Sequence, residues 1–130
     1  MANTASTPIP ESKELPRLED LPGVNLGPVM ELLGGDKALL GQLLGDFLGE
    51  FEGLPDEAEA ALLAGETECL TRRMHTLKGT AANLGLMELS RLAANVEMAL
   101  KQNHPVAEAL AALRQSLVVH LPAIRAAAEV

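Results

Sequence analysis

The residues of this chain with the clearest chemical potential lie close together, around His75. Lys78 follows this histidine by three residues and Gly79 by four. In a helix, such spacings place both residues beside the imidazole on one surface. A neutral imidazole is a good nucleophile near pH 7, and a lysine ammonium can hold anionic oxygens as a point charge. The combination predicts a histidine that accepts a phosphoryl group, with space above Gly79 for a docking partner.

The periodicity of the surrounding residues predicts that His75 faces solvent. A helix is expected from about residue 66 to 84, with an apolar seam that faces the core. The seam consists of Leu70, Met74, Leu77, Ala81 and Leu84. At about 100° per residue, His75 lies about 140° from Leu70. On its side of the helix Arg72 adds a second positive charge, while Gly79 and Ala82 keep the surface low.

What the sequence lacks limits the chemistry that His75 could perform. It contains no P-loop, no glycine-rich nucleotide loop and no zinc-ligand spacing. We therefore expect no metal site, no cofactor and no ATP-dependent kinase activity of its own, so a partner must supply Mg²⁺ and the phosphoryl group. The plain alternative is an ordinary surface histidine. Against it, a glycine such as Gly79 in an exposed helix costs about 0.5–1 kcal/mol relative to alanine without any packing benefit.

Composition favours an all-α fold and excludes several functional classes. The chain has 130 residues, of which 48% are hydrophobic but only 2% aromatic, so leucine and alanine must build the core as helices. A net charge of −8 argues against nucleic-acid binding, which needs a basic surface. A single cysteine, Cys69, rules out an intramolecular disulfide and favours a reducing compartment. No stretch is long and apolar enough to span a membrane.

Proline, glycine and capping residues divide the chain into segments. Residues 1–22 are expected to form a flexible Pro-rich tail or linker, and residues 23–130 an antiparallel four-helix bundle with a short extra N-terminal helix. The expected helices cover residues 25–33, 36–53, 55–65, 66–84 and 87–102, and a last one begins at residue 105.

Several local details can be compared with the structure. We expect Asn25 and Asp36 to cap the first two helices. Pro122 should kink or interrupt the last helix near Val118. A row of glycines recurs every four residues in the second helix, at positions 41, 45, 49 and 53. The favoured explanation is close approach of a neighbouring helix, and a dimer seam is the alternative.

The motif around His75 resembles that of the histidine-containing phosphotransfer (HPt) domain of multistep phosphorelays. The resemblance rests on residues 75–79, His-Thr-Leu-Lys-Gly, and continues through residues 81–85. Further similarity lies upstream in residues 21–24, in residues 34–36 and in the Leu/Phe-rich helix that follows, and downstream in residues 92–97. Altogether it covers about residues 21–130.

The resemblance implies that His75 accepts a phosphoryl group from a receiver-domain aspartate and passes it to another receiver aspartate. Lys78 would stabilise the phosphate, and Gly79 would leave room for the receiver's active-site loop. Glu97, on the adjacent helix, would orient His75. The receiver would contribute Mg²⁺ and the acyl phosphate, so the chain would act as a phosphocarrier.

The implied setting is a cytoplasmic monomer that binds response regulator receiver domains, without nucleic-acid or direct membrane contact. The Pro-rich start favours a C-terminal module of a hybrid sensor kinase, which could itself be membrane-bound. Two alternatives stay open: a non-catalytic helical adaptor that binds a partner helix, and the phosphotransfer domain of a chemotaxis-type kinase.

Overall fold

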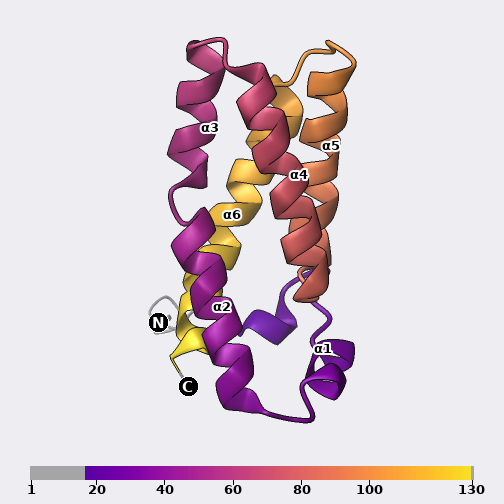
Figure 1. Ribbon diagram of the computed structural model, residues 1–130, viewed down its shortest axis with the longest axis vertical. Coiled ribbons are helices and arrows are strands. Elements are labelled where there is room, and N and C mark those ends of the chain that lie inside the picture. Colours follow the sequence, from indigo (N-terminus) through magenta and orange to yellow (C-terminus); the bar gives the residue numbers. More distant parts are fainter. Residues whose placement is uncertain (1–16, 130) are drawn as a thin grey trace, which may run out of the picture.

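Leucine and alanine, both strong helix formers, shape the part of the chain that the computed structural model describes, residues 17–129. The elements in chain order are η2 (Leu18–Asp20), α1 (Gly27–Leu32), α2 (Lys37–Phe51), α3 (Leu54–Leu63), α4 (Thr67–Asn83), α5 (Met87–Lys101) and α6 (Ala107–Ala128). The longer helices form an antiparallel four-helix bundle (Figure 1). The predicted fold, including the short N-terminal helix α1, is confirmed.

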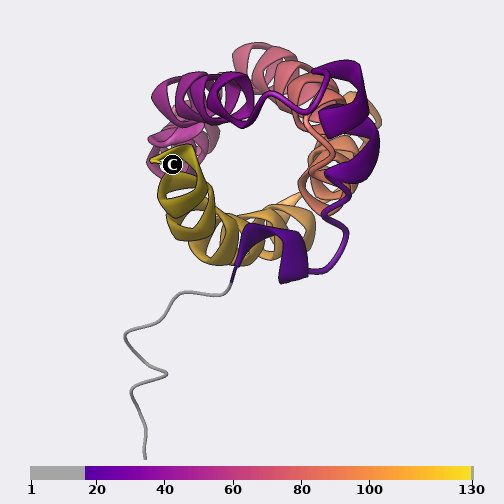
Figure 2. The same ribbon diagram turned by 90° about the horizontal axis from the view of Figure 1, so that it is seen from below.

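The bundle positions α4 and α5 side by side along most of their length. These two helices pack against each other most extensively, and α6 packs against both α5 and α2. The fourth helix position of the bundle is shared by α2 and α3, which follow one another along the same side of the bundle (Figure 1). Viewed from below, the helices surround a common core (Figure 2).

The core is mainly aliphatic, with the only two phenylalanines of the sequence at its centre. Phe47 and Phe51 are buried on α2 with ring centroids 4.9 Å apart. The guanidinium of Arg73 lies over the Phe51 ring, 5.1 Å from its centroid. All five residues of the predicted seam on α4 are buried. The seam therefore fixes which side of α4 is left for solvent.

The bundle begins earlier in the chain than the sequence predicts. Leu18 and Leu21 are buried in the core, and η2 contacts α6. Their spacing of three residues lets both side chains point inward from a single turn of 3₁₀ helix. The expected boundary after residue 22 is therefore wrong for the last residues of that segment, while residues 1–16 lie outside the described part.

The segment after η2 is tied to the turn between α4 and α5. The Asn25 N–H donates to the Gly85 carbonyl at 2.8 Å, and the Met87 N–H donates to the Gly23 carbonyl at 2.8 Å. Gly85 has φ +77°, and a Cβ built on it would lie 2.2 Å from the Asn25 carbonyl oxygen. The predicted capping of α1 by Asn25 is wrong. Leu26 occupies that position without a side-chain hydrogen bond.

Two further local predictions meet different outcomes. Asp36 does cap α2, since its Oδ1 accepts from the Leu39 N–H at 3.1 Å. Pro122, in contrast, does not interrupt α6, which is continuous from Ala107 to Ala128. The carbonyl that loses its donor belongs to Val118, on the solvent side of the helix, where water can hydrate it. Neither α6 nor any other helix within residues 17–129 is long and apolar enough to cross a membrane.

The glycine row that begins in α2 and ends at Gly53, just before α3, does not mark a close helix contact along its length. Gly41 is buried, but a Cβ built on Gly45, Gly49 or Gly53 would meet no atom within 4 Å. Four residues advance a helix by about 400°, so each step of the row drifts about 40° around the axis. The row therefore leaves the core side of the helix, and the predicted close approach is wrong at these positions.

Candidate functional site

His75 lies near the middle of α4, on the side opposite the buried seam. Its neighbours Met74 and Leu77 are fully buried, whereas the His75 side chain is 67% exposed. The regular helix and the apolar seam together hold the imidazole out toward solvent. This is the orientation that the periodicity predicts.

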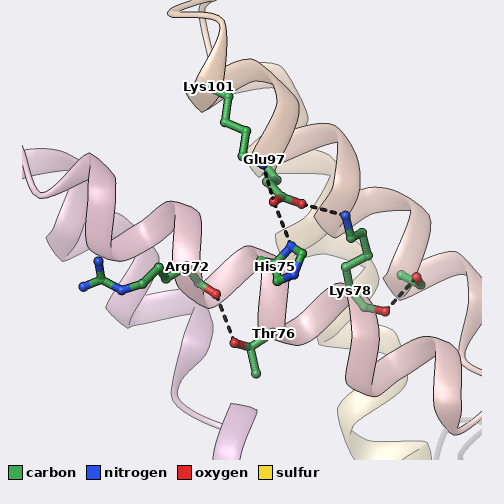
Figure 3. Close-up of polar contacts among 7 residues, drawn as sticks. Arg72, His75, Thr76, Lys78, Glu97 and Lys101 are labelled. Atoms are coloured by element: carbon green, nitrogen blue, oxygen red, sulfur yellow. Dashed lines mark hydrogen bonds and ion pairs between the residues drawn. The ribbon is translucent and has the colours of Figure 1, made fainter.

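The pairing of α4 with α5 places a carboxylate beside the imidazole (Figure 3). Glu97 of α5 is only 4% exposed, yet it contacts three donor groups. Its Oε2 lies 3.0 Å from the His75 Nδ1 and 3.0 Å from the Lys101 Nζ. Its Oε1 lies 3.0 Å from the Lys78 Nζ. A buried carboxylate is thus surrounded by two ammonium groups and one imidazole.

These donors keep Glu97 ionised. Burial alone would raise the pKa of this carboxyl group, because it penalises the charged form. Hydrogen bonds from Lys78, Lys101 and His75, together with the charge of Lys78, outweigh that effect and hold the pKa at about 2. At neutral pH the site therefore contains a buried negative charge with direct cationic partners.

The ionised Glu97 selects the proton position on the His75 ring. A carboxylate can only accept, so the Nδ1 that faces it must carry the hydrogen. In the neutral ring, Nε2 then keeps the lone pair. Because the His75 side chain is mostly exposed, this nitrogen is available to an electrophile brought by a second molecule.

Lys78 is held at both its side chain and its backbone. The side chain is 38% exposed and pairs with Glu97. Its carbonyl accepts from the Ser90 hydroxyl at 2.8 Å, so buried Ser90 links α5 to α4 beside the site. The sequence offered no signal for this role of Ser90, because a single serine in a helix has no distinctive spacing.

The surface next to His75 is low and open. Gly79 is exposed, and a Cβ built on it would meet nothing within 4 Å. Ala82, one turn further along α4, is also exposed. Another molecule can therefore approach the imidazole along this side of the helix.

Of the predicted site residues, the structure brings together His75, Lys78 and Glu97, with Gly79 and Ala82 beside them. Arg72 is exposed, and its guanidinium points away from His75 and Glu97 in Figure 3. Only its carbonyl takes part locally, accepting from the Thr76 hydroxyl at 3.0 Å. The structure adds Lys101, which sequence reasoning missed although it follows Glu97 at a spacing of four.

The other histidines lie apart from this site. His104 is exposed in the connection before α6. His120 is buried on α6, where its Nδ1 lies 2.9 Å from the Ser116 carbonyl oxygen. Within residues 17–129, no group of three or more His, Cys, Asp or Glu side chains could hold a metal ion.

Comparison with known protein families matches residues 42–128 to the model described as the Hpt domain. The matched region runs from α2 to the end of α6 and contains the whole site around His75. Comparisons with curated proteins and with solved structures gave no significant match.

Proposed function

Since the chain belongs to the Hpt domain family, the histidine phosphotransfer domains of phosphorelays, we propose that His75 is its phosphoacceptor. His75 takes a phosphoryl group from the aspartate of one receiver domain and passes it to the aspartate of another. The observation that carries the proposal is the exposed imidazole whose Nδ1–H is held by buried Glu97. That contact leaves Nε2 as the nucleophile.

The proposed transfer is an in-line displacement at phosphorus. Nε2 attacks, the N–P bond forms, and the bond from phosphorus to the receiver's aspartyl oxygen breaks, so the aspartate leaves as a carboxylate. Nδ1 keeps its proton, and the ring gains positive charge. Glu97, 3.0 Å from Nδ1, stabilises that charge. Such reactions depend mostly on positioning and electrostatics, which these side chains supply, while Mg²⁺ comes with the receiver.

The neighbouring residues divide the remaining work. Lys78 stabilises the oxygens of the transferred group, since it follows His75 by about one helical turn and its ammonium contacts the same carboxylate as the imidazole. Gly79 and Ala82 leave space for the active-site loop of the receiver. Arg72 contributes a positive charge at the edge of the docking surface rather than at the phosphate.

We place the domain in the cytoplasm as a monomeric C-terminal module of a hybrid sensor kinase. The Pro-rich composition of residues 1–16 supports a linker to an upstream part of such a kinase. The cognate partners are two receiver domains that share the His75 surface in turn. This context has to be tested with receivers from the same relay.

The function is tested by incubating the chain with a receiver domain carrying labelled aspartyl phosphate. The wild-type chain should acquire label that is stable to base and labile to acid, as a phosphohistidine is. His75→Gln should acquire none, whereas His104→Gln, the control at an exposed histidine outside the site, should match the wild type. Undiminished labelling of His75→Gln would refute the assignment. Receiver binding without any labelling of the wild type would favour a non-catalytic adaptor.

A further inference from the structure

Lys101 is a second lysine partner of Glu97. The unphosphorylated site does not explain why two lysines are present, because Lys78 and His75 already contact the carboxylate. Lys78 reaches Oε1 of Glu97 and Lys101 reaches Oε2, each at 3.0 Å. The two ammonium groups approach the carboxylate from different sides (Figure 3). Lys78 belongs to α4, the helix of His75, whereas Lys101 is in the last turn of α5.

The two lysines become unequal when a phosphoryl group is placed on Nε2. The group brings anionic oxygens to the surface beside Lys78, and as this ammonium turns toward them it shares its charge between the phosphoryl group and Glu97, which weakens its contact with Glu97. Glu97 is 4% exposed, so water cannot replace the lost partner. A buried carboxylate that loses its counterion is strongly destabilised.

Lys101 is placed to prevent that loss. It shares Oε2 with the His75 Nδ1, so it stays next to the oxygen that holds the ring. It follows Glu97 by four residues on one helix, the order of acid and base that is favourable in a helix. Its position in the last turn of α5 also matches a positive charge to the negative helix end. The ion pair between Glu97 and Lys101 therefore lies within α5 and does not depend on α4.

We propose that Lys101 is a positioning residue, which keeps the buried Glu97 paired and in contact with His75 while Lys78 turns to the phosphoryl group. The inference rests on the proposed phosphotransfer at His75. Lys101 itself does not touch the reacting atoms. It acts through Glu97, which keeps the Nδ1–H in place before and after transfer.

The test compares Lys101→Met, which removes the charge and retains an apolar stem, with Lys101→Arg, which restores a cation. Lys37→Met, at an exposed lysine at the start of α2, is the control for loss of a surface charge. Single-turnover transfer from a phosphorylated receiver is measured over a range of receiver concentrations. Loss of one charge-assisted hydrogen bond in the transferred state predicts a maximal rate about tenfold lower for Lys101→Met.

Three kinetic outcomes support the inference, together with NMR spectra of the His75 ring. The receiver concentration at half-maximal rate should be unchanged in Lys101→Met, Lys101→Arg should recover most of the rate, and Lys37→Met should equal the wild type.

In ¹⁵N NMR spectra, the His75 ring of unphosphorylated Lys101→Met should keep its proton on Nδ1, because Lys78 still pairs with Glu97. After phosphorylation, the Nδ1 signal should differ from that of the wild type.

The results that overturn the inference are separate from those that overturn the function. If the wild type is labelled on His75 and Lys101→Met reaches the same maximal rate, Lys101 has no positioning role. The same conclusion follows if Lys101→Arg is as slow as Lys101→Met, or if only the half-maximal concentration changes. If the wild type acquires no label at all, the proposed function fails and this inference falls with it.

Discussion

Glu97→Gln should remove most of the acid dependence of folding that the site creates. Glutamine has nearly the shape of glutamate but no charge, so it imitates the protonated side chain. The pKa of Glu97 is about 2, against an ordinary value of 4.5. Since each tenfold change in proton affinity is worth about 1.4 kcal/mol, ionisation of Glu97 contributes about 3 kcal/mol to folding at neutral pH. The Glu97 side chain is almost fully buried, but His75 and Lys101 are 67% and 61% exposed, so solvent screening makes about 3 kcal/mol an upper value.

The pH range follows from the direction of the change. The pKa is lowered in the folded chain, so the stabilisation is complete above the unfolded value of 4.5 and is lost as the pH falls through about 2. The free energy of unfolding of Glu97→Gln should therefore lie up to about 3 kcal/mol below that of the wild type at pH 7. The two should approach each other, to within about 1 kcal/mol, near pH 2.

Urea unfolding followed by circular dichroism at several pH values between 7 and 2 measures this difference directly. Subtracting the two curves removes the contributions of all other groups that titrate alike in both proteins. Glu88→Gln is the matched control, because Glu88 is on the same helix and its pair with Arg91 is on the surface. Its difference from the wild type should stay within about 1 kcal/mol. A Glu97→Gln difference that is small at pH 7, or that persists unchanged to pH 2, would refute the reasoning.

Two glycines give further predictions, each with a control glycine. Gly79→Gln should slow phosphotransfer at least tenfold, because the added side chain fills the approach to His75, and it should stabilise the helix by about 0.5 kcal/mol. The control Gly45→Gln, at an equally open site on α2, should stabilise its helix without slowing transfer. Equal transfer by both variants would contradict the need for clearance. Gly85→Ala should lower the free energy of unfolding by more than about 2 kcal/mol, because it adds a backbone clash to a positive φ. Gly34→Ala, with positive φ but open space, should cost only about 1 kcal/mol in the same urea titration, and equal losses would show that the clash is relieved.

The details that sequence reasoning missed share one physical cause. The burial of Leu18 and the pairing of Asn25 with Gly85 both depend on which other part of the chain a segment contacts. Capping preference and helix periodicity are local and carry no information about contacts between distant segments of the chain. Asp36 was predicted correctly because a cap involves only its own first turn.

The sequence by itself determined the helical class and the direction of His75. Both follow from the periodicity of one segment, because an apolar seam from Leu70 to Leu84 can be buried in only one orientation. The resemblance added Glu97 as a neighbour of the ring. Only the tertiary structure decided that Glu97 is buried, ionised and shared by Lys78 and Lys101. That depends on the register of α4 against α5, which is set by packing across the whole interface and is not encoded in either helix alone.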